Sequence, residues 1–210
     1  MFNFGGLACA FTLFAASLQN KRDSNLIREN TEGELKMIKA IVYHTRTGYT
    51  EKYARALSEK INLPCYKLDR ALGELGKNDE VIYMGNISSG AVNGYGKARK
   101  NFNVVYVVGV GISYPTNEHK EDVRDKTEVF NVPFYLLRGG IDYSQIGHLK
   151  GFFFRKFAEL CYACRERGED TKHDNETIKV MMNGGDFFDP EYLQPIVDWY
   201  NEQKAKDEQQ

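Results

Sequence analysis

Short apolar runs alternate with amphipathic segments along most of the chain. Runs rich in Val, Ile and Tyr that are bounded by polar residues are typical of strands. They predict strands at 41–43, 80–84, 104–111 and 132–137, with a short edge strand at 63–68, where Pro64 lacks a backbone donor. Apolar residues at helical spacing predict helices after the first strand, at 121–130, and after Asp189-Pro190, which offers an N-cap and a proline at the first helical position.

Strands and helices alternate with linkers of a few residues. This alternation predicts an α/β fold in which helices cover both faces of a parallel sheet. With five strands, the expected doubly wound order is 2-1-3-4-5, and a ligand is expected beyond the carboxyl ends of the strands, between the first and the third. A long insertion, about residues 141–177, precedes the last helix.

Residues 1–36 do not continue this pattern. Residues 2–18 are strongly apolar, but no Lys or Arg precedes them and the run is short for a membrane span. Met37 stands just before the first strand, so we expect it to be the biological start, with a signal peptide or a membrane anchor as alternatives. The predicted domain then covers residues 37–205, and residues 1–36 are an extension outside it.

A polar loop joins the first strand to the helix that follows it. It supplies hydroxyl groups, backbone N–H donors and a glycine that permits a sharp bend. The first N–H groups of a helix lack intrahelical partners and the helix dipole is positive there, so this loop predicts a phosphate site. The glycines of a dinucleotide fingerprint and the Gly-Lys-Ser/Thr of a P-loop are missing, and an ordinary helix cap is the alternative. The loop residues are Thr45, Arg46, Thr47, Gly48, Tyr49 and Thr50.

The strand, loop and helix resemble the flavodoxin signature, Ser/Thr-x-Thr-Gly-x-Thr followed four residues later by alanine, here Ala54. The resemblance implies a flavodoxin-like fold whose loop binds the phosphate of FMN. Two further loops, 85–90 and 109–114, are expected at the same sheet edge, where their glycines and polar groups would face the flavin. Their expected FMN-binding residues are Asn86, Ile87, Ser88, Ser89, Gly90, Gly109, Val110, Gly111 and Tyr114. Tyr95 or Tyr114 is a candidate to stack on the ring, and His44 borders the loop.

The composition of the chain argues against some classes of function. A formal net charge of -1 over 210 residues argues against a nucleic-acid partner, because a nucleic-acid-binding face normally shows as a basic excess. Four cysteines at irregular positions do not form a disulfide framework and predict a reducing, cytoplasmic location. Cys161 and Cys164 form a C-x-x-C motif within a helical pattern; no second pair accompanies them, so we predict no metal site and leave a redox role open.

The insertion contains an aromatic and basic stretch, Phe152-Phe-Phe-Arg-Lys-Phe157. With the Thr-Arg-x-Gly-x-Thr form of the loop, it resembles the menaquinone-dependent protoporphyrinogen dehydrogenases, which have the flavodoxin fold. The resemblance implies an oxidoreductase that passes electrons between an organic donor and a quinone-like acceptor or redox partner. Helix 149–162 is suited to peripheral contact with a membrane or to a flat apolar molecule; alternatively its phenylalanines pack into the sheet while Arg and Lys extend to water.

Two other functions stay open. One is a flavodoxin-type electron carrier without a substrate site. It is disfavoured because electron-carrying flavodoxins are usually strongly acidic and often place an aromatic residue beside the flavin, whereas the only tryptophan here, Trp199, lies on the last helix. The other is a binding module that has lost FMN.

Overall fold

The computed structural model describes residues 37–144, 146–168 and 174–208. The predictions for residues 1–36, including the choice between Met1 and Met37 as the start, lie outside the described residues, as do residues 145 and 169–173 of the predicted insertion.

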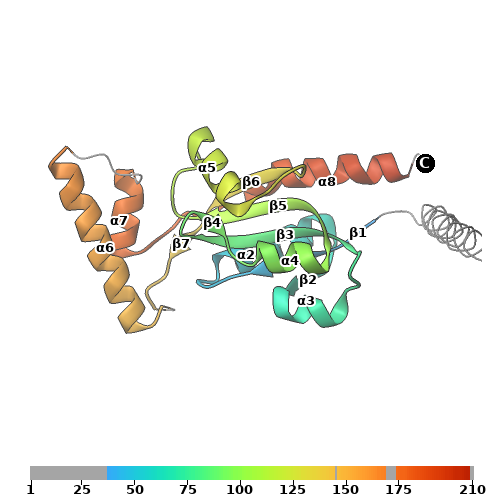
Figure 1. Ribbon diagram of the computed structural model, residues 1–210, viewed down its shortest axis with the longest axis horizontal. Coiled ribbons are helices and arrows are strands. Elements are labelled where there is room, and N and C mark those ends of the chain that lie inside the picture. The colour runs from blue at the N-terminus through green and yellow to red at the C-terminus, as the bar shows by residue number, and fades with distance from the viewer. Residues whose placement is uncertain (1–36, 145, 169–173, 209–210) are drawn as a thin grey trace, which may run out of the picture. The chain divides into compact units, whose positions relative to one another are not determined.

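Five parallel strands form the centre of the domain (Figure 1). They are β1 (Ile38–His44), β2 (Cys65–Lys67), β3 (Glu80–Ser88), β5 (Asn103–Gly111) and β6 (Phe134–Arg138). Their spatial order is β2-β1-β3-β5-β6, with the two-residue strand β4 (Ala91–Val92) paired antiparallel to β3. The α/β class and the mostly parallel five-stranded sheet are therefore confirmed, and counting only the parallel strands gives the predicted order 2-1-3-4-5.

Helices cover both faces of this sheet. On one face, α2 (Tyr49–Ile61), the 3-10 turn η1 (Pro190–Leu193) and α8 (Gln194–Asp207) cover residues such as Ile41 and Ile82. On the other face, α3 (Leu68–Glu74), α4 (Tyr95–Asn101) and α5 (Asn117–Thr127) cover their neighbours, such as Val42 and Val81. Because successive strand residues point to opposite faces, burial on both sides explains why these strands are continuously apolar.

The segment 85–90 differs from the predicted loop. Strand β3 continues to Ser88 and turns back into β4 through Ser89 and Gly90, which have φ values of 54° and 78°. Two central residues with positive φ form the kind of tight turn that matches the twist of a β-hairpin. The sequence prediction missed this hairpin because the second strand is only two residues long.

Helix α5 begins four residues before its predicted start. The Thr116 side chain accepts a hydrogen bond of 3.1 Å from the backbone N–H of His119 and so caps the helix. The polar segment after β4, which carried no helix prediction, forms α4. At the C-terminal end, Asp189 caps η1 as predicted by accepting a hydrogen bond of 2.9 Å from the N–H of Glu191.

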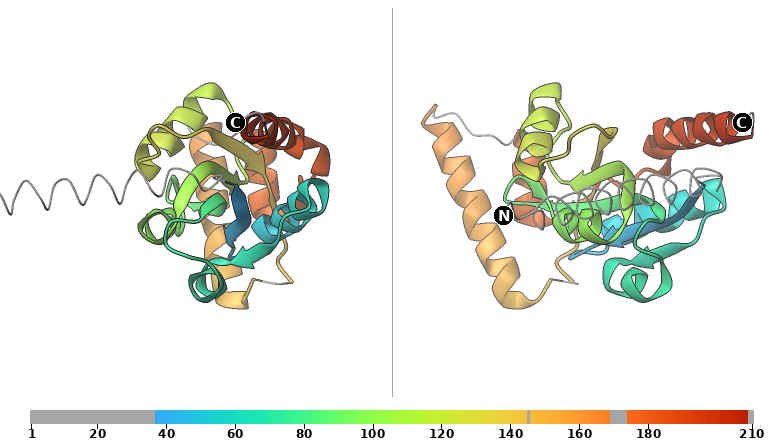
Figure 2. Two further views of the ribbon diagram at one scale, coloured as in Figure 1. Left: turned by 90° about the vertical axis from the view of Figure 1, so that its right-hand side faces the viewer. Right: turned by 45° about the vertical axis from the view of Figure 1, so that its right-hand side comes forward.

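The insertion folds into a separate layer at the end of the domain away from the last turns of α8 (Figures 1 and 2). It comprises β7 (Gly140–Ile141), α6 (His148–Glu166) and α7 (Asn175–Asn183), and β7 pairs antiparallel with β8 (Gly185–Asp186). A small apolar cluster, Ile141, Ala158, Val180 and Met181, holds these elements together.

Most large apolar side chains of α6 do not pack against the sheet. The exposed ones are Phe152, Phe153, Phe154, Phe157, Leu160 and Tyr162. For Phe152, Phe153 and Phe157 the alternative that the phenylalanines pack into the sheet is therefore wrong, because α6 contacts α7 and its apolar cluster through the face that carries Ala158. Among the helices that the structure describes, none combines the length and the apolar character needed to cross a bilayer.

Replacing Asp174 with alanine should lower the free energy of unfolding by about 1 kcal/mol near neutral pH, because α7 loses its N-cap. Asp174 accepts hydrogen bonds of 2.8 Å from the backbone N–H and from the hydroxyl of Thr177. Burial opposes ionisation, but these hydrogen bonds and the positive charge of Arg138 outweigh it and lower the pKa of Asp174.

This contribution is therefore complete above the unfolded-state pKa of about 4 and is lost as the pH falls through the lower folded-state pKa. Urea unfolding of the wild type and of Asp174→Ala between neutral and acid pH checks the prediction. Asp174→Asn, which keeps a capping acceptor, should lose less stability. An alanine variant whose deficit does not shrink in acid would contradict the role of the carboxylate.

Candidate functional site

A cavity of about 250 Å³ lies at the carboxyl edge of the parallel sheet. The loop after β1, the carboxyl ends of β3 and β5 and the segment after β6 meet there, together with residues of the insertion. The lining residues are Arg46, Thr47, Tyr49, Thr50, Asn86, Ile87, Ser88, Val110, Gly111, Ile112, Gly139, Gly140, Ile141, Ile146, Gly147 and Phe154. The volume is just below the roughly 300–1,000 Å³ of small-molecule pockets.

Residues from all three predicted loops line this cavity. They are Arg46, Thr47, Tyr49, Thr50, Asn86, Ile87, Ser88, Val110 and Gly111. Thr45, Gly48, Ser89, Gly90, Gly109 and Tyr114 are not part of its wall. Thr45 and Gly48 instead shape the loop, since the N–H of Gly48 donates to Thr45 Oγ1 at 3.0 Å and Gly48 begins α2 with a φ of 85°.

Among the described residues, Thr50 stands out because its buried hydroxyl group, in the cavity wall, has no hydrogen-bond partner. Its side chain is only 1% exposed, and Oγ1 has no hydrogen-bond partner within the described part of the chain. Thr50 lies in the first turn of α2, where backbone N–H groups also lack intrahelical partners. Because an unsatisfied buried hydroxyl costs free energy, this end of the cavity is suited to a ligand with hydrogen-bond acceptors.

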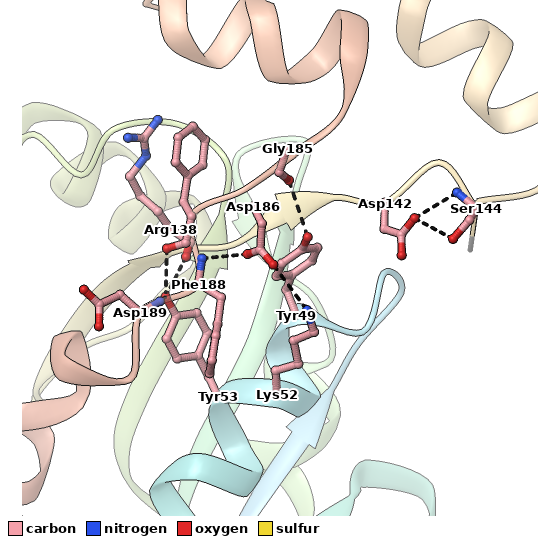
Figure 3. Close-up of polar contacts among 11 residues, drawn as sticks. Tyr49, Lys52, Tyr53, Arg138, Asp142, Ser144, Gly185, Asp186, Phe188 and Asp189 are labelled. Carbon is pink, nitrogen blue, oxygen red and sulfur yellow. Dashed lines mark hydrogen bonds and ion pairs between the residues drawn. The ribbon is translucent and has the colours of Figure 1, made fainter.

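Tyr49 joins the loop to the β7–β8 ribbon (Figure 3). Its hydroxyl donates to the carbonyl of Gly185 at 3.4 Å, and the Lys52 ammonium lies 4.6 Å from its ring centroid and 3.4 Å from the Asp186 carboxylate. Burial and then the charge of Asp186 raise the pKa of Tyr49 to about 12. Tyr49 is therefore a neutral hydrogen-bond donor at physiological pH, and its ring forms part of the fixed wall.

Gly139 and Gly140 allow Tyr49 to contact the β7–β8 ribbon. A Cβ atom on Gly139 would lie 3.0 Å from Tyr49 Cβ, and one on Gly140 would lie 2.6 Å from Tyr49 Cζ and against the Gly185 carbonyl oxygen. The two glycines bring the segment after β6 against the first turn of α2.

Asn86 and the ends of β3 and β5 form another part of the cavity wall. Asn86 Oδ1 and His44 Nδ1 are 3.1 Å apart, so the histidine fixes the amide at the cavity edge. A Cβ atom on Gly109 would lie 2.8 Å from Leu136, and one on Gly111 would lie 3.1 Å from Ile87. Both glycines therefore make room for neighbouring protein side chains, and Gly111 also lines the cavity.

The two tyrosines that were candidates to stack on a flavin do not line the cavity. Tyr95, the first residue of α4, is buried in the core with its ring centroid 6.1 Å from that of Tyr83, so a stacking role for Tyr95 is wrong. Tyr114 is exposed, and its ring lies 5.5 Å from the guanidinium carbon of Arg138.

Arg138 links α7 to the cavity wall through polar contacts. Only 10% of its side chain is exposed; Nη1 lies 2.8 Å from Glu176 Oε2, and Nη2 donates to the carbonyl of Ile112 at 3.3 Å. Its guanidinium also lies 3.6 Å from the ring centroid of Phe187. One side chain thus connects α7, the end of β5 and the segment after β8.

The sequence prediction did not name the cavity-lining residues that follow β6 or belong to the insertion, nor Ile112 within the predicted loop 109–114. These residues are Ile112, Gly139, Gly140, Ile141, Ile146, Gly147 and Phe154. The Gly139-Gly140 pair was the available signal, because it directly follows the fifth strand at the sheet edge where the other loops meet. The apolar residues among them give part of the cavity wall an apolar character, in addition to the hydroxyl groups of Thr47 and Thr50.

Comparison with protein-family models and with curated proteins finds no match to this chain.

Proposed function

We propose that this chain is a flavodoxin-like FMN-binding oxidoreductase that passes electrons between an organic donor and a quinone-like acceptor. The observation that carries the proposal is the buried, unpartnered Thr50 hydroxyl in the first turn of α2, inside a cavity at the carboxyl edge of the sheet. A phosphate group would satisfy that hydroxyl and the unpaired N–H groups of the helix start together.

The donor set of the loop fits a phosphate. Thr47 and Thr50 supply hydroxyl groups, Arg46 supplies a cation, and α2 supplies backbone N–H groups and the positive end of its dipole. No carboxylate lines the cavity among the described residues. An anion at this end would therefore meet donors and positive charge.

The remaining wall suits the flavin part of FMN. Asn86 and Ser88 offer polar groups for the ring edge, while Ile112, Ile141 and Phe154 offer an apolar surface that would exclude water. Bound FMN would supply the electron-transfer chemistry, and the protein residues would bind it, orient it and shield it.

The apolar side of the cavity favours an enzyme over a carrier. A carrier needs only an accessible flavin edge, whereas here the insertion brings Ile146 and Phe154 to the cavity wall. These side chains offer a flat apolar acceptor a surface beside the FMN site. Two alternative functions, an electron carrier and a binding module without FMN, are distinguished from the enzyme by the experiment below.

An absorbance spectrum of the purified protein, before and after incubation with FMN and removal of the excess, tests cofactor binding. Anaerobic photoreduction followed by addition of a menaquinone then tests the acceptor. A retained flavin spectrum with rapid reoxidation supports the enzyme. Retention without reoxidation by the quinone identifies a carrier, and a colourless protein that takes up no FMN overturns the proposal.

Replacing Thr50 with valine should change stability and FMN affinity in opposite directions. Removing an unsatisfied buried hydroxyl while keeping the shape should stabilise the protein without FMN by about 1 kcal/mol or more. Losing a hydrogen bond to a charged phosphate should weaken FMN binding by about 1.5–3 kcal/mol, or roughly 10- to 150-fold.

Thermal unfolding without FMN and fluorescence titration with FMN measure the two effects. Thr50→Ser, which keeps the hydroxyl, serves as the control for affinity. A valine variant that binds FMN as tightly as the wild type would remove the main support for the phosphate site.

We further propose that α6 contacts a membrane surface that holds the quinone, so that the protein works at the cytoplasmic face of a membrane. Phe153, Phe157 and Leu160 are exposed at spacings that place them on one face of the helix. Exposed Lys156 and Arg165 lie on the same helix, exposed Arg167 directly follows it, and their positive charges favour anionic lipid.

Replacing Phe153 with serine should reduce binding to phosphatidylglycerol-containing vesicles roughly 10- to 150-fold, because one inserted aromatic ring contributes roughly 1.5–3 kcal/mol. Phe130→Ser is a matched control, since both phenylalanines are 63% exposed and only Phe153 lies on α6. Sedimentation with vesicles measures the effect. Equal losses in the two variants, or no vesicle binding by the wild type, would contradict a docking role for α6.

A further inference from the structure

Cys161 and Cys164 lie one turn apart on α6, a helix that is continuous from His148 to Glu166. Residues three apart in an α-helix lie on neighbouring positions of one face, with Cβ atoms about 5–6 Å apart. A disulfide joins Cβ atoms that are about 3.5–4.5 Å apart. The two side chains are therefore neighbours, and a disulfide between them needs a local tightening of about 1–2 Å near the C-terminal end of α6.

The two sulfur atoms have different surroundings. Cys161 is buried, and Cys164 is half-buried and accepts a hydrogen bond from Arg167 Nη2 at 3.3 Å. A guanidinium group beside a sulfur atom stabilises the thiolate, which is the nucleophile in thiol–disulfide exchange. Burial, and then the neighbouring Cys164, raise the pKa of the Cys161 thiol. Cys164 is thus the more exposed sulfur, in contact with a cation, and Cys161 is the sheltered one.

We propose that Cys161 and Cys164 are a reversible redox modification site, in which Cys164 reacts with a small-molecule disulfide and Cys161 then closes an intramolecular disulfide. In the first step the Cys164 thiolate attacks one sulfur of glutathione disulfide, forming a mixed disulfide and releasing one glutathione thiolate. In the second step Cys161 loses its proton and attacks Cys164 Sγ, releasing the second glutathione. The two cysteines lose two electrons to glutathione disulfide, and their two protons end on the two released glutathiones.

The site lies on the helix that borders the cavity. Cys161 follows Phe154 by seven residues, so the two share one face of α6, and Phe154 lines the cavity. Oxidation would form a covalent bond between Cys161 and Cys164, C-terminal to Phe154 on the same helix. The inference does not depend on FMN, because the exchange chemistry needs only the two cysteines and the disulfide reagent.

The test incubates the full chain with glutathione disulfide, blocks remaining thiols with N-ethylmaleimide in acid, and maps modified peptides by mass. The wild type should form a Cys161–Cys164 disulfide that dithiothreitol reverses. Cys161→Ser should accumulate stable glutathione on Cys164, whereas Cys164→Ser should leave Cys161 largely unmodified. Cys65, on β2, serves as an internal thiol for comparison of rates.

A wild type that keeps glutathione on Cys164 would overturn the proposal, as would one that stays fully reduced while Cys65 reacts. Equal reactivity of the remaining cysteine in the two serine variants would overturn the assigned roles. Circular dichroism of each variant checks that the helix is intact. If a variant fails to fold, the wild-type peptide map alone decides whether the disulfide forms.

Discussion

Replacing Thr47 with glutamate should abolish FMN retention. Thr47 lines the cavity and is partly exposed, so the longer side chain fits without being buried. Its carboxylate would stand within a few ångströms of a phosphate, and two charges about 4 Å apart near a protein surface interact by about 4 kcal/mol. FMN affinity should therefore fall roughly a thousandfold, which is enough to lose the flavin during purification.

Thr47→Gln is the matched control, because glutamine has nearly the same size and shape but no charge. It should bind FMN far more tightly than the glutamate variant does. Flavin absorbance after gel filtration and a fluorescence titration measure both variants, and thermal unfolding without FMN checks that both are folded. Normal flavin occupancy in Thr47→Glu would show that the phosphate does not bind at this loop.

Replacing Gly140 with alanine should destabilise the protein and damage the cavity together. The added Cβ would lie 2.6 Å from Tyr49 Cζ, 2.7 Å from its hydroxyl oxygen and against the backbone carbonyl of Gly185. Gly140 also pairs with Asp186 in the β7–β8 ribbon, so neither neighbour can move without breaking a contact. Overpacking of this kind costs about 1–3 kcal/mol.

In a chain of this length that cost lowers Tm by roughly 2–4 °C per kcal/mol. Because Tyr49 lines the cavity, FMN affinity should fall as well. Gly96→Ala in α4 is the opposite control: its Cβ would meet nothing within 4 Å, so it should stabilise the protein by about 0.5–1 kcal/mol. If both alanine variants are equally stable, the close packing of Gly140 on Tyr49 is wrong.

Local sequence signals predicted the framework of the sheet. The apolar run 104–111 predicted a central strand, and β5 spans Asn103–Gly111. The Thr45–Thr50 loop predicted the start of α2, because hydroxyl side chains and a glycine determine a helix start through contacts within one turn. Once strands and helices alternate, the connection rules of parallel sheets leave few possible orders, and the observed order is the predicted one.

The roles of residues whose packing depends on distant parts of the chain could not be predicted from local sequence signals. Tyr95 has the composition of a ligand-stacking residue, but it packs on Tyr83 because α4 covers that face of the sheet. Ser89 and Gly90 looked like ligand-binding loop residues, but they form a hairpin turn whose returning strand is too short to recognise. The phenylalanines of α6 looked able to pack into the sheet, but the helix faces α7 instead.

The sequence by itself therefore determined the parallel sheet, the strand order and the loop at the start of α2, because periodicity, turn residues and helix caps act over a few residues. Only the tertiary structure decided that Gly139, Gly140 and Phe154 join that loop around one cavity, and that α6 exposes its aromatic side chains. Those outcomes depend on where the insertion packs, and packing is set by the shapes of residues far apart in the chain.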